Sequence, residues 1–219
     1  MESKQWVEMH TKGDHPGHLQ SSAMCLVAYQ ERKTLRLDKL SEIQWHLVTE
    51  KISLEGIFVF GGIKGEVPDM KLKDNNLYRL SIGDKNHTWS IVETSGPQPE
   101  ARYQHSMHFI KASNLIILVG GRRLQDMSFS TDHDAEFIKD THILDMRSLE
   151  WSIIKFQGTQ LGGIYNFSSC LTDDGDLYIF GGTKDPMHHN KKLFRIRDLS
   201  TSNNAPSSMA QRSHERSFD

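Results

Sequence analysis

Cysteine is scarce in this sequence, with two in 219 residues, Cys25 and Cys170. Two cysteines cannot form a disulfide framework, and a chain without one is typical of a reducing compartment. Both lie in apolar stretches, so we expect reduced thiols that pack in the core like small hydrophobic side chains. The sequence therefore favours an intracellular protein.

Long hydrophobic runs and an excess of one charge are also absent. No run approaches the roughly 18 apolar residues of a membrane-spanning helix, and the first residues lack an apolar signal segment. The 26 lysines and arginines nearly balance the 28 aspartates and glutamates, for a formal net charge of −2. Such a balance gives no electrostatic attraction to nucleic acid or to an anionic membrane. We expect a soluble, cytoplasmic protein that binds neither.

The sequence lacks the patterns that carry catalysis. It has no nucleophile elbow, no phosphate-binding loop and no Ser-x-x-Lys. Its 12 histidines include a group at His10, His15 and His18 and a pair at His188–His189. No cysteine is near either set, and spacing alone is a weak indication of a metal site. We therefore expect no catalytic residue, no cofactor and no metal.

What the sequence does have is an internal repeat marked by three pairs of glycines. Each pair follows a short apolar run, and the pairs are Gly61-Gly62, Gly120-Gly121 and Gly181-Gly182. The second glycines stand at positions 62, 121 and 182, so the pairs are 59 and 61 residues apart. A short apolar run that ends at glycines predicts a buried strand, and glycine supplies the positive φ or close backbone approach at its end.

Other strands keep the same phase. One strand-like stretch precedes each glycine pair and another follows it. A further stretch is led by Trp89 in the first unit and by Trp151 in the second, whereas the third unit has no such tryptophan. We therefore predict repeated units of four strands, in which glycines end the second strand and tryptophan opens the fourth.

With these features the sequence resembles the kelch-repeat family. The match consists of the glycine pairs, the two tryptophans, the strands around Tyr78 and Ile143, and an Arg-x-x-His start at Arg102 and His105. The resemblance covers residues 17–200. It implies an all-β fold, a partial β-propeller of about three four-stranded blades.

The resemblance also implies what the signature residues do. Blades are expected at 17–93, 102–155 and 163–200. The tryptophans are expected to pack between blades, and Arg102 and His105 to tie one blade to the next. These roles are structural, as are those of the glycines.

Three segments depart from the repeat. An insertion at about 30–55 carries a capping-box pattern that predicts a short helix over 41–51. Trp45 in this helix either packs it onto the blade or contacts a partner, because tryptophan is enriched at binding hot spots. Residues 1–16 form an N-terminal segment, and residues 201–219 form a tail whose composition predicts disorder.

The connections between second and third strands are the most variable parts of the repeat. We interpret 63–75, 122–139 and 183–190 as loops. The middle one contains Arg122, Arg123 and Phe129 among acidic residues, a mixture that suits either an interface loop or a solvated loop. These three residues are candidate partner contacts.

Three blades are too few to close a ring, because propellers have about four to eight. The third unit lacks a tryptophan strand, and a strand containing Trp6, over residues 4–9, precedes the first unit. We therefore expect closure between chains, in which a second copy or another kelch chain completes the ring and Trp6 contacts the partner. The alternative is a gene fragment or a divergent chain whose arc docks on another protein.

These observations favour a non-catalytic scaffold for protein–protein interaction. The insertion and first unit also resemble kelch proteins abundant in ciliated single cells, which suggests a cytoskeletal or axonemal assembly. The alternative is a propeller-based enzyme of the oxidase or lyase type, with a site completed by a partner chain. A convergent cluster of His, Tyr or Glu side chains would distinguish it.

Overall fold

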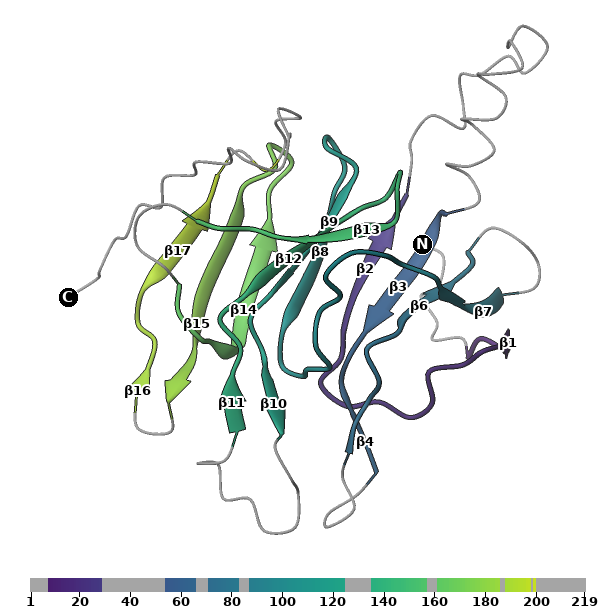
Figure 1. Cartoon of the computed structure of the whole chain (residues 1–219), viewed down its shortest axis with the longest axis horizontal. Coiled ribbons are helices and arrows are strands. Elements are labelled where there is room, and N and C mark those ends of the chain that lie inside the picture. The colour runs from purple at the N-terminus through teal and green to yellow at the C-terminus, as the bar shows by residue number, and fades with distance from the viewer. Residues whose placement is uncertain are drawn as a thin grey trace, which may run out of the picture.

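A computed structural model of the chain describes residues 8–28, 54–65, 71–82, 87–124, 135–156, 161–185, 188–197 and 199. Over these residues the fold is all-β and contains no helix, and its three larger sheets lie side by side (Figure 1). The expectation of an all-β partial propeller is confirmed. Each sheet is called a blade below.

The blades follow one another along the chain, and each begins with its innermost strand. Blade 1 contains β2 (Ala23–Val27), β3 (Gly56–Phe60), β6 (Leu77–Leu80) and β7 (His87–Val92), with β1 (Thr11–Gly13) beside β7. Blade 2 contains β8 (Ser106–Ile110), β9 (Leu115–Val119), β12 (Thr141–Asp145) and β13 (Glu150–Ile153). Blade 3 contains β14 (Tyr165–Leu171), β15 (Leu177–Asp185) and β17 (Leu193–Ile196). In the described part of blade 3 no strand follows β17, and residues 200–219 lie outside the described residues, so the absence of a fourth strand stays a prediction.

The segments interpreted as loops between second and third strands contain short strands instead. They are β4 (Ile63–Lys64) with β5 (Lys71–Leu72), β10 (Arg122–Leu124) with β11 (Ala135–Phe137), and the end of β15 with β16 (His188–His189). These ribbons lie at the same end of the blades in Figure 1. The loop interpretation is therefore wrong at their bases, because antiparallel pairing continues past each glycine pair.

Two hydrophobic clusters fill the spaces between the blades. Between blades 1 and 2, Phe58 and Phe60 pack with Met107, Leu118 and other apolar side chains. Between blades 2 and 3, the members include Ile117, Val119, Ile179 and Phe194. All five residues of β9 are buried, because the middle blade has a neighbour on both sides.

The segment before each of the first two blades runs parallel to the outer strand of that blade. Strand β1 pairs in parallel with β7, and Ser95 makes a parallel bridge to Glu150. Trp89 Nε1 donates to Thr11 Oγ1 at 3.2 Å, and Trp151 Nε1 donates to Thr94 Oγ1 at 3.1 Å. The two tryptophans are thus held alike by a threonine.

Several predictions fall wholly or partly outside the described residues. They concern the helix over 41–51 with Trp45, the strand containing Trp6, the loop residue Phe129 and the tail over 201–219. Of the expected strand over 4–9, Glu8 and Met9 are described and are not in a strand. The first described strand is β1 instead, because the chain gains backbone partners only when it reaches the edge of β7.

Candidate interaction surface

The glycine pairs lie where one blade joins the next. Gly61 has a φ of +63°, and a Cβ there would lie 2.2 Å from the carbonyl oxygen of Arg102. The neighbouring Gly62 N–H donates to the same oxygen at 2.8 Å. A side chain at Gly61 would therefore separate blade 1 from blade 2.

The second glycine pair repeats this contact between blades 2 and 3. A Cβ at Gly120 would lie 2.6 Å from the carbonyl oxygen of Ile164, and Gly121 N–H donates to that oxygen at 2.8 Å. Gly181 has a similar φ of +73°, but no described atom lies within 4 Å of its Cβ position. Among the described residues, the junction at the end of blade 3 is thus unused.

A second set of backbone bonds joins the inner strands of the three blades. Ser21 and Gln104 come just before β2 and β8, and Asn166 is the second residue of β14; their φ values are 55°, 54° and 54°. Gln104 N–H donates to Ser21 O at 3.0 Å, and Asn166 N–H donates to Gln104 O at 3.1 Å. Because residues other than glycine rarely adopt positive φ, the recurrence indicates one geometry imposed at each blade start.

The two repeat tryptophans have different surroundings. Trp151 is 1% exposed and packs between blades, with its ring centroid 6.2 Å from that of Phe60. Trp89 is half-buried and packs edge-on against His15 at 5.4 Å. Trp151 has the expected place between blades, whereas no described blade lies on the side of Trp89.

The face of blade 1 that points away from blade 2 is apolar, and no described sheet covers it. Three of its side chains, Val59, Tyr78 and Leu80, are buried, so the exposed part of the face is smaller than the whole. Strand pairing places Met24, Val59, Tyr78 and Ile91 in one row across it. The next row holds Leu26, Ile57, Leu80 and Trp89. We call these eight residues the blade-1 face. Met24 is 68% exposed and Leu26 is 53% exposed.

The equivalent face of blade 2 shows what such a surface does. Met107 stands three residues after Gln104, as Met24 stands three residues after Ser21. Met107 is only 3% exposed, because blade 1 covers it. The blade-1 face therefore has the pattern of a blade-packing surface without its blade.

The free face of blade 3 has a more mixed composition. Strand pairing places Ser168, Phe180 and Leu193 in one row and Cys170, Tyr178 and Arg195 in the next. We call these six residues the blade-3 face. Arg195 forms an ion pair with Asp176, and its guanidinium lies over the Tyr178 ring at 5.5 Å.

Cys170 is exposed on this face, so the expectation of a core thiol is wrong for it. Its strand is apolar on one side only, and the thiol points to the side where no described blade follows. Cys25 is half-buried and packs against the cluster between blades 1 and 2, and burial raises its pKa to about 12.

Buried polar groups at the start of blade 2 stabilise the backbone. Arg102 is fully buried and donates to the carbonyl oxygens of Glu100 and Gly120 and to Asp140 Oδ1 at 2.7 Å. Burial acts to raise the pKa of Asp140, but interactions with His142 and Arg102 outweigh it and hold the pKa at about 2. The carboxylate thus stays charged beside the guanidinium.

His105 is buried between blades 1 and 2. Its ring lies edge-on to that of Phe60, with centroids 5.8 Å apart. Burial lowers the pKa of His105 to about 3, and the charge of Arg102 acts in the same direction. A neutral, buried imidazole at the junction agrees with the structural role expected of it.

The candidate contacts Arg122 and Arg123 have partners within the chain. The Arg122 guanidinium lies between the rings of Tyr103 and Tyr165, at 4.8 Å and 4.6 Å. Arg123 Nη1 lies 2.5 Å from Glu100 Oε2. Contact of either arginine with a partner stays a prediction.

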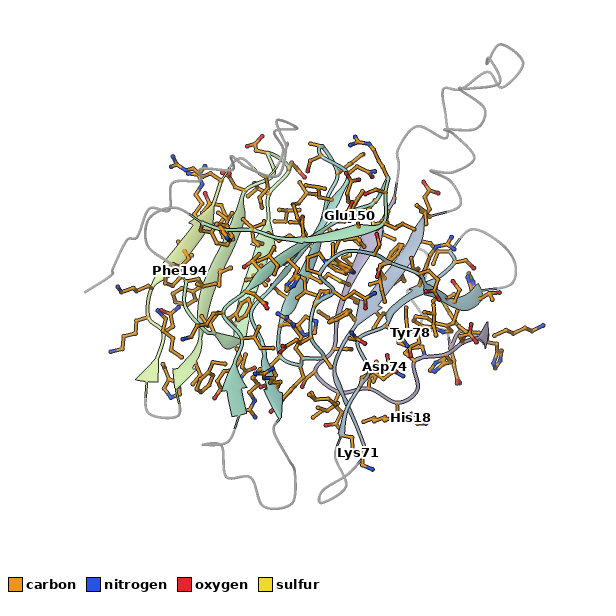
Figure 2. The ribbon with its side chains drawn as sticks, viewed as in Figure 1. His18, Lys71, Asp74, Tyr78, Glu150 and Phe194 are labelled. Carbon is orange, nitrogen blue, oxygen red and sulfur yellow. The ribbon has the colours of Figure 1, made fainter. Side chains whose placement is uncertain are left out.

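A similar arrangement occurs in blade 1, where the Tyr78 hydroxyl donates to Asp74 at 3.0 Å. Lys73 lies over the tyrosine ring at 4.7 Å. Figure 2 labels Tyr78 and Asp74, which lie close together at one end of blade 1.

No cluster of three His, Cys, Asp or Glu side chains that could hold a metal occurs within the described ranges. Across the same ranges, no helix has the length and hydropathy needed to cross a membrane. The sequence analysis missed Met24 and Leu26 as candidate contacts. The signal was present, because Met24 and Met107 occupy equivalent places in two units.

The family model described as the KLHDC2/KLHL20/DRC7 Kelch-repeats domain matches residues 47–215. Kelch domain-containing protein 3 of Bos taurus is 29% identical over 150 residues, which are 66% of this chain and 35% of that protein. The tRNA wybutosine-synthesizing protein 4 of Saccharomyces cerevisiae is 31% identical over 112 residues, which are 51% of this chain and 14% of that protein. The chain thus spans about a third or less of the length of these two curated relatives.

Solved structures share the fold. A chain of a RAG complex with one melted and one unmelted RSS, solved by cryo-EM, matches with a TM-score of 0.59 at 16% identity. The match covers 95% of this chain and 55% of that chain. YjhT matches with a TM-score of 0.52 at 14% identity, over 73% of this chain and 48% of that chain. Identities this low show a shared fold alone.

Proposed function

Since the chain belongs to the kelch-repeat family, we propose that it is a non-catalytic scaffold whose blade-1 face binds a blade of another kelch chain. Kelch-repeat domains are generally protein-interaction domains. The observation that carries the proposal is Met24, which is 68% exposed where its equivalent Met107 is 3% exposed. An apolar surface of this kind marks an interaction site.

The incomplete arc supports closure by another chain. Three blades are described, and the chain spans about half of the RAG-complex chain and of YjhT. A second copy or another kelch chain could supply the remaining half. The candidate contacts Trp6, Trp45 and Phe129 belong to this proposal as possible contributors from outside the described residues.

The non-catalytic role has support of its own. The buried Arg102 binds two backbone carbonyls and the half-buried Asp140, as part of a structural network does. The activity named for the yeast relative belongs to a protein of which this chain spans 14%. Kelch domains are generally non-enzymatic, which favours the scaffold over an oxidase or lyase.

We also propose a cytoplasmic place in a cytoskeletal or axonemal assembly. Its support is the resemblance of the first unit to kelch proteins of ciliated cells and the two free cysteines. Fluorescent tagging in a ciliated cell tests it. Co-localisation with axonemal or cytoskeletal fibres supports the proposal, and exclusion from both contradicts it.

Affinity capture from native extract tests the scaffold. We expect a kelch chain, either this one or another, to co-purify in near-stoichiometric amount and to be identified by mass spectrometry. Met24→Glu should reduce its recovery at least tenfold, because a charge would be buried in the contact. Ile153→Glu is the matched control, since Ile153 is 48% exposed on the outer strand of the middle blade. Equal recovery with both variants contradicts the proposal.

A further inference from the structure

We propose that the partner is a second copy of this chain, with the blade-3 face of each copy packed on the blade-1 face of the other. The inference rests on the proposed function and names its partner. Two arcs of three blades then form one six-bladed ring with two identical junctions. This is a closed two-fold arrangement.

The first junction within the chain predicts the contact at the new one. The Arg102 carbonyl accepts from Gly62 N–H, and Arg102 stands two residues before Gln104, which has a positive φ. The Ile164 carbonyl accepts from Gly121 N–H, and Ile164 stands two residues before Asn166, which also has a positive φ. In blade 1 the residue two before Ser21 is Leu19. At the new junction Gly182 N–H therefore donates to the carbonyl oxygen of Leu19 in the second copy.

The inner set of backbone bonds continues in the same way. The bonds run from Gln104 N to Ser21 O and from Asn166 N to Gln104 O. The next bond in this series runs from Ser21 N of the second copy to Asn166 O. Both new bonds follow from repeat position alone, so they fix the register of the two copies with no free choice.

The side chains on the two faces also correspond. His108 Nε2 and Ser169 Oγ are 2.8 Å apart between blades 2 and 3. His108 stands four residues after Gln104, and Ser169 stands three residues after Asn166. At the new junction the same places hold Cys170, four after Asn166, and Met24, three after Ser21. The thiol and thioether would meet as soft apolar groups.

Burial of these faces leaves no lone charge. Met24 and Leu26 face Phe180, which is 52% exposed, together with the half-buried Leu193. Arg195 is already neutralised by Asp176 and rests on Tyr178. An apolar surface thus meets another in which the one charged residue is paired, so the desolvation cost is small.

The described strands of blade 3 favour a second copy in particular. In the described residues β17 pairs with β15 and with no outer strand. Trp6 stands five residues before Thr11, as Trp89 stands five before Thr94. The segment with Trp6 lies outside the described residues, and its repeat position predicts that it supplies the fourth strand of a blade that precedes blade 1. In a second copy that blade is blade 3, which has three described strands.

Sedimentation velocity with a matched glycine pair tests the junction. The wild-type chain should sediment as a dimer, and Gly181→Ala should be monomeric at the same concentration because its methyl group would meet the Leu19 carbonyl. Gly162→Ala is the control, since Gly162 has a φ of +72° and no described atom within 4 Å. Both variants carry the same backbone strain, and only one lies at the junction. A monomeric wild type, or two variants that associate equally, overturns the inference.

Disulfide cross-linking tests the contact without relying on those variants. In a Cys25→Ser background, Met24→Cys should form an interchain disulfide with the native Cys170, identified as a linked peptide. The same protein with Cys170→Ser should give no such dimer. Absence of the linked peptide overturns the second copy as partner. If a different kelch chain is still captured through Met24, the scaffold proposal stands, so the two failures are distinguishable.

Discussion

At the scale of single residues, the buried polar groups of blade 2 make folding sensitive to acid. His105 is neutral in the folded protein, with a pKa of about 3, against about 6.5 in an unfolded chain. The unfolded state therefore binds a proton first as pH falls below about 6.5. Stability is fully present above that pH and is lost progressively towards pH 3.

Thermal unfolding as a function of pH checks this. When the pH falls from 7 to 5, we expect protonation of His105 in the unfolded state to lower the free energy of unfolding by about 2 kcal/mol, or the Tm by roughly 4–8 °C. His105→Gln should be less stable at pH 7 but lose less stability on acidification. Asp140, with a pKa of about 2, adds a further loss only below about pH 4, in the same direction. An unchanged pH slope in the variant contradicts the assignment.

The glycine pairs show how much of the structure around single residues can be predicted from the sequence. Their place at strand ends and their positive φ are predictable, because the repeat returns them after each apolar run. The surroundings of Gly181 are not, because its sequence pattern equals that of Gly61 and Gly120. Only the fold shows that no described backbone lies opposite Gly181.

At the scale of elements, the parallel segment before each blade fixes the outer strand. Thr94 Oγ1 accepts from the buried Trp151, and Thr11 Oγ1 accepts from the half-buried Trp89. Removal of Thr94 Oγ1 leaves the buried Trp151 N–H without an acceptor, whereas water can replace Thr11 Oγ1 as the acceptor for Trp89. The two threonines thus form a matched pair.

Thr94→Val should lower the free energy of unfolding by about 1–3 kcal/mol. Thr11→Val should lower it by less than about 1 kcal/mol. Urea unfolding of both variants in the Gly181→Ala background, where the blade-1 face stays open, gives the comparison. Equal losses contradict this account of the tryptophan contacts.

The strands of the blades were predictable, since short apolar runs and glycines carry a local signal. The ribbon of β10 and β11 was not, because Arg122 and Arg123 are polar and do not belong to an apolar strand pattern. Strand β1 escaped prediction because its partner is far away in the sequence. Its parallel pairing with β7 depends on contacts over about 75 residues of chain, and no local pattern records such a contact.

At the scale of the whole molecule, the number of blades was predictable and the uncovered faces were not. Apolar residues such as Met24 fit a strand equally well when covered or open. What decides their exposure is a neighbour, and the neighbour is not encoded in the strand itself. In the sequence, the exposed face is indicated only by the equivalence of Met24 and Met107. That equivalence can be recognised only once the repeats are aligned in register.

An associating arc has a concentration-dependent stability, because a partner that binds only the folded chain shifts unfolding by mass action. We expect the wild-type Tm to rise by several degrees between about 1 and 100 µM. The Tm of Gly181→Ala should stay constant over that range. A wild-type Tm independent of concentration contradicts association of the folded chain.

The unused junction at Gly181 has a consequence for how the repeats cooperate. Arrays of repeats draw much of their stability from contacts between neighbours, and their end repeats usually carry a polar cap. In the part of the chain that the structure describes, blade 1 has no such cap. Two separate arcs contain four blade junctions, and one ring made from them contains six. Ring closure thus adds two junctions to the four that the separate arcs contain, while almost no additional part of the chain has to become ordered.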